Sequence, residues 1–323
     1  MESMNRLFAG FILLCGLVVP SSAATNGIEI VRATWTDAAR KRDVPVTVYL
    51  PASSTSAAPV IIFSHGLGGT RDGYAYLGRH WATNGFVSVH VQHLGSDVEI
   101  LRGAKRPVES FREAIMNPKN TIERPKDVSF ALNELTRLNA IEGPFKGLLD
   151  LKHVGVAGHS FGAHTAMSVA GMSFPTPVWN FADDRFTAAM AFSPMAPRTQ
   201  TEKRFSSVRI PVMHLTGTAD DSPIGETLAK DRRVPFDLIR DVPQLLLTLN
   251  GGDHMVFSGT EGVLRESVRD AIHHDLILQG TTAFWNATLK SDDKAIQRMA
   301  EGGFAKNLGT NGVLELKGWK FQK

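Results

Sequence analysis

The chain has 323 residues, of which 43% are hydrophobic and 21% charged, an ordinary composition for a globular protein. Its formal net charge of +3 comes without a run of lysine and arginine, so we expect no nucleic-acid partner. The one cysteine excludes an intramolecular disulfide, and the fold must therefore depend on its hydrophobic core.

The first 23 residues have the pattern of a secretory signal peptide. A basic residue precedes the apolar stretch 7–19, and small residues follow it. A short membrane anchor and a buried N-terminal helix are alternatives, but the stretch is short for a bilayer span. Cys15 lacks the small preceding residue usual in lipoprotein signals, which argues against lipidation. We predict a signal peptide at 1–23, a single domain at 24–323, and a secreted or periplasmic protein without a stable membrane anchor after cleavage.

Strand-like segments recur along the sequence that follows. Segments 28–34 and 44–50 alternate between apolar and polar residues, which predicts a pair of antiparallel strands. Continuous apolar runs, typical of strands that are buried on both faces, recur further along the chain. These runs lie at 60–63, 86–91, 154–157, 188–192, 212–216 and 245–249.

Helical patterns separate these strands. They lie at 74–84, from Pro125 to Leu138, and at 161–171, 262–279 and 292–300. Pro125 is expected to open its helix, since proline is favoured in the first turn, whereas residues 97–124 give no clear pattern. Because strands alternate with helices, we predict an α/β fold with a mostly parallel central sheet and helices on both faces.

The segment Gly158-His159-Ser160-Phe161-Gly162 joins a predicted strand directly to a predicted helix. This is the G-x-S-x-G pattern in the context of the α/β-hydrolase fold, where a sharp turn lifts the serine hydroxyl above the sheet. Glycines two residues before and after the serine allow neighbouring backbone to approach closely. The alternative is a glycine–serine turn without chemical meaning. We predict that Ser160 is a nucleophile.

A second glycine-rich segment, Ser64–Gly69, follows the strand at 60–63. In α/β-hydrolases the loop at this place donates one backbone N–H to an oxyanion, and the residue after the nucleophile donates the second. We assign these two donors to Leu67 and Phe161. His65 is an alternative catalytic base, but we expect its side chain to brace the loop, because the backbone does the chemical work there.

In this fold the acid and the base follow the serine in the order Asp or Glu, then His. His254 lies in a glycine-containing loop after a predicted strand, whereas the other candidate histidines after Ser160 fall within predicted helices or strands. Asp220 lies just beyond the preceding strand, and we expect it to orient His254 as the acid of a catalytic triad. Asp221 is the alternative acid, and Asp253 is expected to serve the structure of its loop.

Apolar residues near these motifs are candidates for substrate contacts. Met195, Met255 and Trp179 lie in segments that could line a pocket beside the nucleophile. Apolar side chains at such places are more often part of the core than substrate contacts. The sequence contains no metal-ligand motif and no dinucleotide-binding motif, so we predict neither a metal nor a cofactor.

The two core motifs resemble those of the platelet-activating-factor acetylhydrolase and predicted dienelactone hydrolase group. The segments that carry the resemblance are Ser64–Gly68, Tyr74–Asp97, Arg124–Phe130 and Gly158–Gly162, within residues 57–260. The resemblance implies Leu67 and Phe161 as oxyanion donors. Acetylhydrolases place their acid after the strand that follows the nucleophile helix, but this chain has Ser193 there, which leaves Asp220 on the next strand. Dienelactone hydrolases use a cysteine in place of Ser160.

These features predict a secreted serine hydrolase that cleaves carboxylic esters, with short to medium acyl chains, through an acyl-enzyme at Ser160. Its substrate would be a small-molecule, lipid or polymeric ester. An amidase, a peptidase or a lyase on the same fold is an alternative. A non-catalytic secreted binding protein is another, although such proteins usually lack a member of the triad.

Overall fold

The computed structural model describes residues 27–52, 56–176, 178–197, 199, 201–259 and 268–320. The predicted signal peptide lies outside these residues. The described strands form one nine-stranded sheet in the order β1-β2-β4-β3-β5-β6-β7-β8-β9. They are β1 (Ile28–Asp37), β2 (Arg42–Pro51), β3 (Ala58–Ser64), β4 (Val87–Val91), β5 (Leu149–His159), β6 (Phe186–Phe192), β7 (Val212–Ala219), β8 (Gln244–Asp253) and β9 (Gly312–Lys317).

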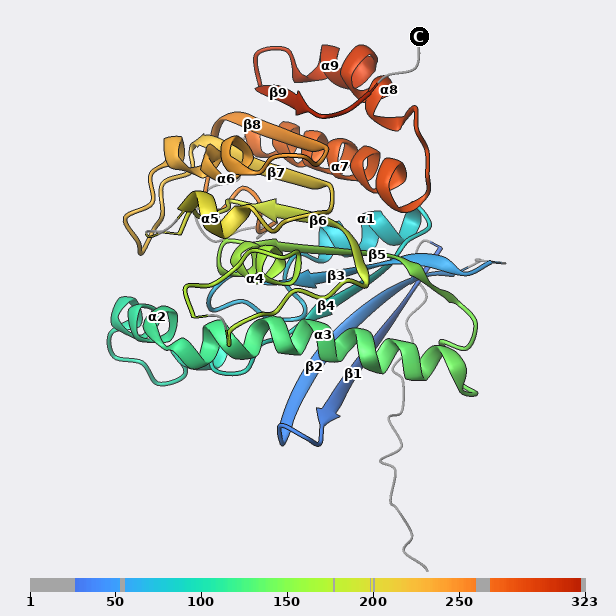
Figure 1. Cartoon of the computed structure of the whole chain (residues 1–323), viewed down its shortest axis with the longest axis vertical. Helices are drawn as coiled ribbons and strands as arrows, with labels where there is room; N and C mark the ends of the chain where they lie inside the picture. Colours follow the sequence, from blue (N-terminus) through green and yellow to red (C-terminus); the bar gives the residue numbers. More distant parts are fainter. Residues whose placement is uncertain are drawn as a thin grey trace, which may run out of the picture.

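The centre of the sheet is parallel and its two edges are antiparallel. Strands β3 to β8 pair in parallel with one another, whereas β1 and β2 at one edge and β9 at the other pair antiparallel. Figure 1 shows β1 and β2 at one end of the molecule and β8 and β9 at the other. Because parallel strands end at the same edge of a sheet, the loops that follow β3, β5, β6, β7 and β8 gather there. All the predicted catalytic residues lie on or beside these loops.

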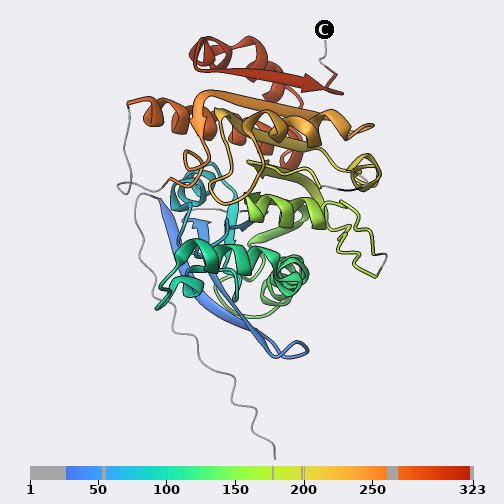
Figure 2. The same cartoon turned by 90° about the vertical axis from the view of Figure 1, so that its left-hand side faces the viewer.

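Helices cover both faces of the sheet, which confirms the predicted α/β fold (Figures 1 and 2). The helices α3 (Pro118–Ala140) and α4 (Phe161–Val169) pack on one face, and α1 (Ala75–Thr83) and α7 (Val268–Leu289) pack on the other. The shorter helices are η1 (Val98–Leu101), α2 (Pro107–Met116), α5 (Thr201–Phe205), η2 (Ala229–Arg233), α6 (Val234–Leu238), α8 (Ala295–Glu301) and α9 (Gly303–Leu308). Within the described ranges, no helix combines the length and the apolar character needed to cross a bilayer.

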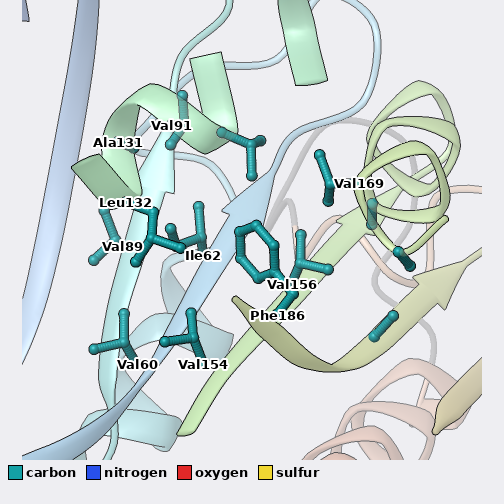
Figure 3. Close-up of a cluster of buried hydrophobic side chains, with 14 of the residues drawn as sticks. Val60, Ile62, Val89, Val91, Ala131, Leu132, Val154, Val156, Val169 and Phe186 are labelled. Atoms are coloured by element: carbon teal, nitrogen blue, oxygen red, sulfur yellow. The ribbon is translucent and has the colours of Figure 1, made fainter. Parts of the chain in front are cut away.

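Apolar side chains fill the space between the sheet and helices α3 and α4 (Figure 3). Val60 and Ile62 of β3 are fully buried, and they share this cluster with Val156 of β5 and Leu132 of α3. Burying one such side chain stabilises the folded state by about 1.5–3 kcal/mol. The continuous apolar runs that predicted these strands therefore also fix the ends of β3 and β5 beside one another.

The structure corrects the predicted start of α3. The helix begins at Pro118, and the side chain of Asn117 caps it by accepting a hydrogen bond of 3.0 Å from the N–H of Lys119. Pro125 lies inside the helix, because Asn117 and Pro118 already supply the cap and the first turn. Residues 97–124, which gave no clear pattern, contain η1, α2 and the first turns of α3.

The C-terminal elements also differ from the prediction. The helix expected at 262–279 is observed as α7 from Val268 to Leu289, and residues 260–267 lie outside the described part of the chain. The helix expected at 292–300 is the shorter α8. Strand β9 was not predicted, since its segment Gly312–Lys317 mixes apolar and charged residues on a partly exposed edge.

Candidate active site

Ser160 lies at the turn between β5 and α4 in a strained backbone conformation. Its φ of 55° and ψ of −114° fall outside the regions that L residues favour, at a typical cost of about 1–3 kcal/mol. The N–H of Ser160 donates a hydrogen bond of 2.9 Å to the carbonyl of Phe192 at the end of β6. The turn is thereby tied to the neighbouring strand, and the serine side chain lies at the carboxyl edge of the sheet, partly exposed to solvent.

The two glycines of the motif are required by close backbone contacts. A Cβ on Gly162 would lie 1.9 Å from the carbonyl oxygen of Ser64, and one on Gly158 would lie 2.2 Å from the carbonyl oxygen of Gly162. Both distances are far below van der Waals contact, so no larger residue fits without moving the backbone. The glycines therefore allow the nucleophile turn to pack directly on the end of β3.

The structure brings Ser160, His254 and Asp220 into one row of hydrogen bonds. His254 Nε2 is 3.0 Å from Ser160 Oγ, and His254 Nδ1 is 2.7 Å from Asp220 Oδ1. Because a carboxylate only accepts, Nδ1 carries the proton and Nε2 is free to accept from the serine hydroxyl. The Asp220 carboxylate is fully buried, and Thr216 Oγ1 donates to its other oxygen at 2.9 Å. This is the arrangement that a nucleophile, a general base and an orienting acid require.

The neighbouring carboxylates face elsewhere. Asp221 is exposed, and its Oδ1 accepts a hydrogen bond of 2.8 Å from the N–H of Ala229. Asp253 Oδ1 accepts two backbone N–H groups of its own loop, each at 2.9 Å. Of the two acids that the sequence left open, Asp220 is the one that contacts His254.

Two backbone N–H groups around the turn have no acceptor among the described residues. They belong to Leu67, in the loop after β3, and to Phe161, the first residue of α4. A helix N-terminus carries a partial positive charge, and α4 presents this end at the serine. The two N–H groups that the sequence assigned to an oxyanion are thus available to bind one.

His65 braces the oxyanion loop from within. Its Nδ1 is 2.6 Å from the carbonyl oxygen of Gly66, and its Nε2 accepts a hydrogen bond of 3.1 Å from the N–H of His93. A carbonyl only accepts, so Nδ1 carries the proton. Burial, followed by the nearby charge of Arg124, lowers the pKa of His65 well below its ordinary value, which keeps the ring neutral. The Gly66 carbonyl and the Leu67 N–H belong to one peptide unit, so this hydrogen bond polarises the predicted donor.

Arg124 joins the two segments that carry the predicted oxyanion donors. Its guanidinium donates to the carbonyl of His65 and lies 4.5 Å from the centroid of the Phe161 ring. Hydroxyl groups accept its other hydrogen bonds, at 3.1 Å for Ser64, 2.8 Å for Ser96 and 3.0 Å for Thr165. Burial lowers the pKa of Arg124 to about 9, which is still above neutrality. The side chain is therefore a buried cation behind the predicted oxyanion site.

A series of hydrogen-bonded, buried polar side chains extends from Ser64 away from Arg124. Ser64 Oγ is 2.8 Å from His93 Nε2, and His93 Nδ1 is 3.1 Å from Asp127 Oδ2. Arg42 donates to both oxygens of Asp127, at 2.8 and 2.9 Å. Burial raises the pKa of Asp127, but the hydrogen bonds from His93 and Arg42 outweigh it and lower the pKa to about 2. No residue pattern or spacing in the sequence marks this network, and the part of α3 that contributes to it lies in a segment that carries the resemblance.

His159 connects His254 to the loop after β3 through Tyr74. Tyr74 Oη accepts a hydrogen bond of 3.3 Å from the N–H of Gly66 and lies 2.7 Å from His159 Nδ1. The centroid of the His159 ring is 4.7 Å from that of His254. Burial, followed by the charge of His254, lowers the pKa of His159 well below its ordinary value. His254 therefore packs beside an uncharged ring.

The three predicted substrate contacts lie in different surroundings. Trp179 packs in an aromatic cluster, with its ring centroid 6.1 Å from that of Phe174. Met255 directly follows His254 and is 50% exposed, and Met195 is partly buried in the segment after β6. The two methionines thus lie on the loops around the base, and their role in a pocket stays a prediction.

Two comparisons with known proteins agree with this architecture. Residues 29–103 match a family model described as platelet-activating factor acetylhydrolase, isoform II, a range that contains the loop after β3. The chain is also 26% identical, over 176 residues, to a platelet-activating factor acetylhydrolase from Cavia porcellus. The alignment covers 47% of this chain and 38% of that relative, so the chain spans less than half the relative's length. These matches and the sheet confirm the predicted resemblance: the chain has the α/β-hydrolase fold and is similar to the platelet-activating factor acetylhydrolases.

Proposed function

We propose that this protein is a serine hydrolase that cleaves carboxylic esters. The observation that carries the proposal is the row of hydrogen bonds from Ser160 Oγ through His254 to Asp220, with distances of 3.0 and 2.7 Å. The similarity to proteins named platelet-activating factor acetylhydrolase supports an ester as the substrate class. The unpaired N–H groups of Leu67 and Phe161 supply what such a reaction needs in addition, a site for the oxyanion.

The reaction would begin with attack by the serine. His254 Nε2 removes the proton from Ser160 Oγ as the oxygen bonds to the ester carbonyl carbon, and the carbonyl oxygen becomes an oxyanion. The N–H groups of Leu67 and Phe161 donate to that oxyanion. Asp220 holds the Nδ1 proton and stabilises the imidazolium that forms. Collapse of the tetrahedral intermediate breaks the bond to the alcohol oxygen, which takes its proton from His254.

Water completes the cycle. A water molecule takes the place of the alcohol, and His254 Nε2 accepts its proton as the oxygen attacks the acyl-enzyme. The second tetrahedral intermediate uses the same two N–H donors. Its collapse releases the carboxylic acid and returns the proton to Ser160, so the cycle consumes one ester and one water.

Labelling with a fluorophosphonate probe tests the nucleophile. We expect the folded wild-type protein to carry the probe on Ser160, identified by mass spectrometry of the modified peptide. The Ser160→Ala variant is expected to fold and to stay unlabelled. Folded wild-type protein that does not react with the probe would contradict the proposal.

A series of p-nitrophenyl esters of increasing acyl length tests the substrate class. We propose a preference for short to medium acyl chains and expect kcat/KM to be highest there, with Ser160→Ala as the inactive control. A preference for long chains would contradict the acyl assignment but leave the serine mechanism standing. Amide and cyanohydrin substrates in the same series separate an esterase from an amidase or a lyase.

We also propose that residues 1–23 are removed as a signal peptide and that the mature protein is one domain, secreted or periplasmic. The proposal rests on the apolar stretch and the small residues that follow it. N-terminal sequencing of protein recovered from the medium or periplasm should begin at Ala24. Recovery of the chain with its apolar stretch intact would contradict cleavage.

A further inference from the structure

The short helix η2 brings a buried arginine to the loops around the acid and the base. Arg232 is 1% exposed, and its Nε is 3.1 Å from the carbonyl oxygen of Asp220 and 3.4 Å from Asp220 Oδ1. Its Nη1 donates to the carbonyl oxygen of Ser193 at 3.0 Å. A single guanidinium therefore contacts the loops that follow β6 and β7.

The same side chain closely approaches the proposed base. Arg232 Nη2 is 3.3 Å from His254 Nδ1. Since Nδ1 carries the proton that is donated to Asp220, both atoms of this pair are donors and no hydrogen bond joins them. The contact is an electrostatic one, and it becomes repulsive when Nε2 of His254 takes up a second proton.

Among the described residues, few charges surround His254 besides this guanidinium. Asp220 faces it from the end of β7, and the ring of His159 faces it from β5 but is neutral, because burial lowers its pKa. Asp221 is exposed and acts on the guanidinium of Arg232 from the outer side. Asp253, next to the base in sequence, binds backbone N–H groups of its own loop. Arg232 is thus the one cation in this set.

Arg232 keeps its charge in this environment. Burial lowers its pKa, and the carboxylates of Asp220 and Asp221 act in the opposite direction. A guanidinium is not deprotonated in proteins at any pH at which this fold would work.

We propose that Arg232 is a positioning residue that sets the lower pH limit of the proposed ester hydrolysis. The inference rests on the proposed serine-hydrolase function. In the free protein the guanidinium opposes the positive charge of a protonated His254, so the ring stays available as a base at lower pH. The hydrogen bond of 2.7 Å from His254 to Asp220 is present in both states, and in the transition state the negative charge of the oxyanion additionally offsets this repulsion. The hydrogen bonds to the carbonyls of Ser193 and Asp220 fix the loops after β6 and β7 relative to each other.

The pH dependence of kcat/KM separates this role from a purely structural one. In Arg232→Gln, which removes the charge, we expect the midpoint of the acid limb to rise by about one pH unit, as for loss of one close charge. In Arg232→Lys, which keeps the charge but not the planar fork, we expect lower activity at the plateau with the midpoint within about 0.3 units of wild type. Arg233→Gln is the matched control, because Arg233 is half-exposed and pairs with Asp237 and Glu315.

The outcomes distinguish this inference from the proposed function. An active wild type together with a folded Arg232→Gln variant whose midpoint is unchanged overturns the inference and leaves the function standing. If Arg232→Gln does not fold by circular dichroism, a rise of about one unit in Arg232→Lys overturns it as well. Titration of the His254 ring by NMR of histidine-labelled protein gives the same midpoint without turnover, so the inference is decided even if esters are not cleaved.

Discussion

Asp220 and Asp221 are adjacent in the chain, but their carboxylates have different partners. Asp220 contacts His254 at 2.7 Å, whereas Asp221 accepts from a backbone N–H at the surface. We expect Asp220→Asn to lower kcat by about 10⁴-fold, as loss of the acid does in a serine triad. Asp221→Asn should stay within a factor of about three of wild type, since a change at an exposed residue has a small effect. Steady-state kinetics on one p-nitrophenyl ester decides between them, and equal losses in both variants would contradict the assignment.

Arg124 would act on the proposed oxyanion site through the backbone. In Arg124→Met the carbonyl of His65 loses its donor and the buried charge disappears, so we expect kcat to fall by about 10²-fold with a smaller change in KM. The affinity for a boronic acid, which resembles the tetrahedral intermediate, should fall in parallel. Arg137→Met is the control on the same helix, because Arg137 is exposed and pairs with Glu134. A variant that loses stability but keeps its kcat and its boronate affinity would show a packing role only.

At the scale of elements, the nucleophile turn depends on the space beside Gly162. A Cβ there would meet the carbonyl oxygen of Ser64 at 1.9 Å, so β3 and α4 must separate in Gly162→Ala. We expect loss of labelling at Ser160 and a stability loss of about 3 kcal/mol or more, as for severe overpacking. Gly303→Ala is the matched control, since a Cβ at this first residue of α9 meets no atom within 4 Å. Urea unfolding measures both variants, and a similar result for the two would contradict the steric argument.

The central strands were predictable because each is a continuous apolar run that ends up buried on both faces. The start of α3 was not predictable, because two prolines are each suited to the first turn of a helix. Pro125 is one of them, but the helix begins earlier in the chain, at Pro118 with Asn117 as its cap. A local rule about proline cannot tell which of two prolines begins a helix. The residues of β9 have no apolar run, and their strand forms by pairing with β8.

The residues of the candidate site also divide into those that the sequence predicts and those that it does not. Ser160, His254 and Asp220 follow from a motif, a chain order and a flexible loop, all of which can be read along one segment at a time. Arg124 lies in a segment that carries the family resemblance, but neither it nor Arg232 has a sequence pattern that gives its role. Both make contacts between distant segments, 28 to 60 residues apart for Arg124 and 12 to 39 apart for Arg232. Such contacts depend on the packed structure, and the sequence carries no local sign of them.

At the scale of the whole molecule, buried histidines make stability depend on pH. The buried histidines include His65, His90, His93, His159 and His214. Burial lowers the pKa of each, to about 4 for His90 and His214, to about 3 for His93, and well below the ordinary 6.5 for the other two. In the folded protein these rings are therefore neutral at a pH at which an unfolded chain would protonate them.

Stability should consequently fall on acidification well before the carboxylates titrate. Below about pH 6.5 the unfolded chain binds more protons than the folded one, so the free energy of unfolding decreases as pH falls towards 4. Each histidine contributes up to about 1.4 kcal/mol per pH unit in this window. Urea unfolding at pH 7, 6 and 5 measures the slope. His214→Gln should reduce this slope by the contribution of one histidine. A free energy of unfolding that does not change between pH 7 and 5 would contradict the argument.

The hairpin of β1 and β2 at one end of the molecule is part of the support of the oxyanion site (Figure 1). Arg42, the first residue of β2, donates a hydrogen bond to Asp127, and Asp127 contacts His93. His93 in turn contacts Ser64, whose hydroxyl accepts a hydrogen bond from Arg124. In a saturation-mutagenesis scan scored by ester turnover, Arg42 should therefore behave like an active-site position although it never meets the substrate. A map of tolerated substitutions on this protein would show sensitivity along a line of buried polar side chains that runs from the hairpin to the serine, in place of a shell around the serine.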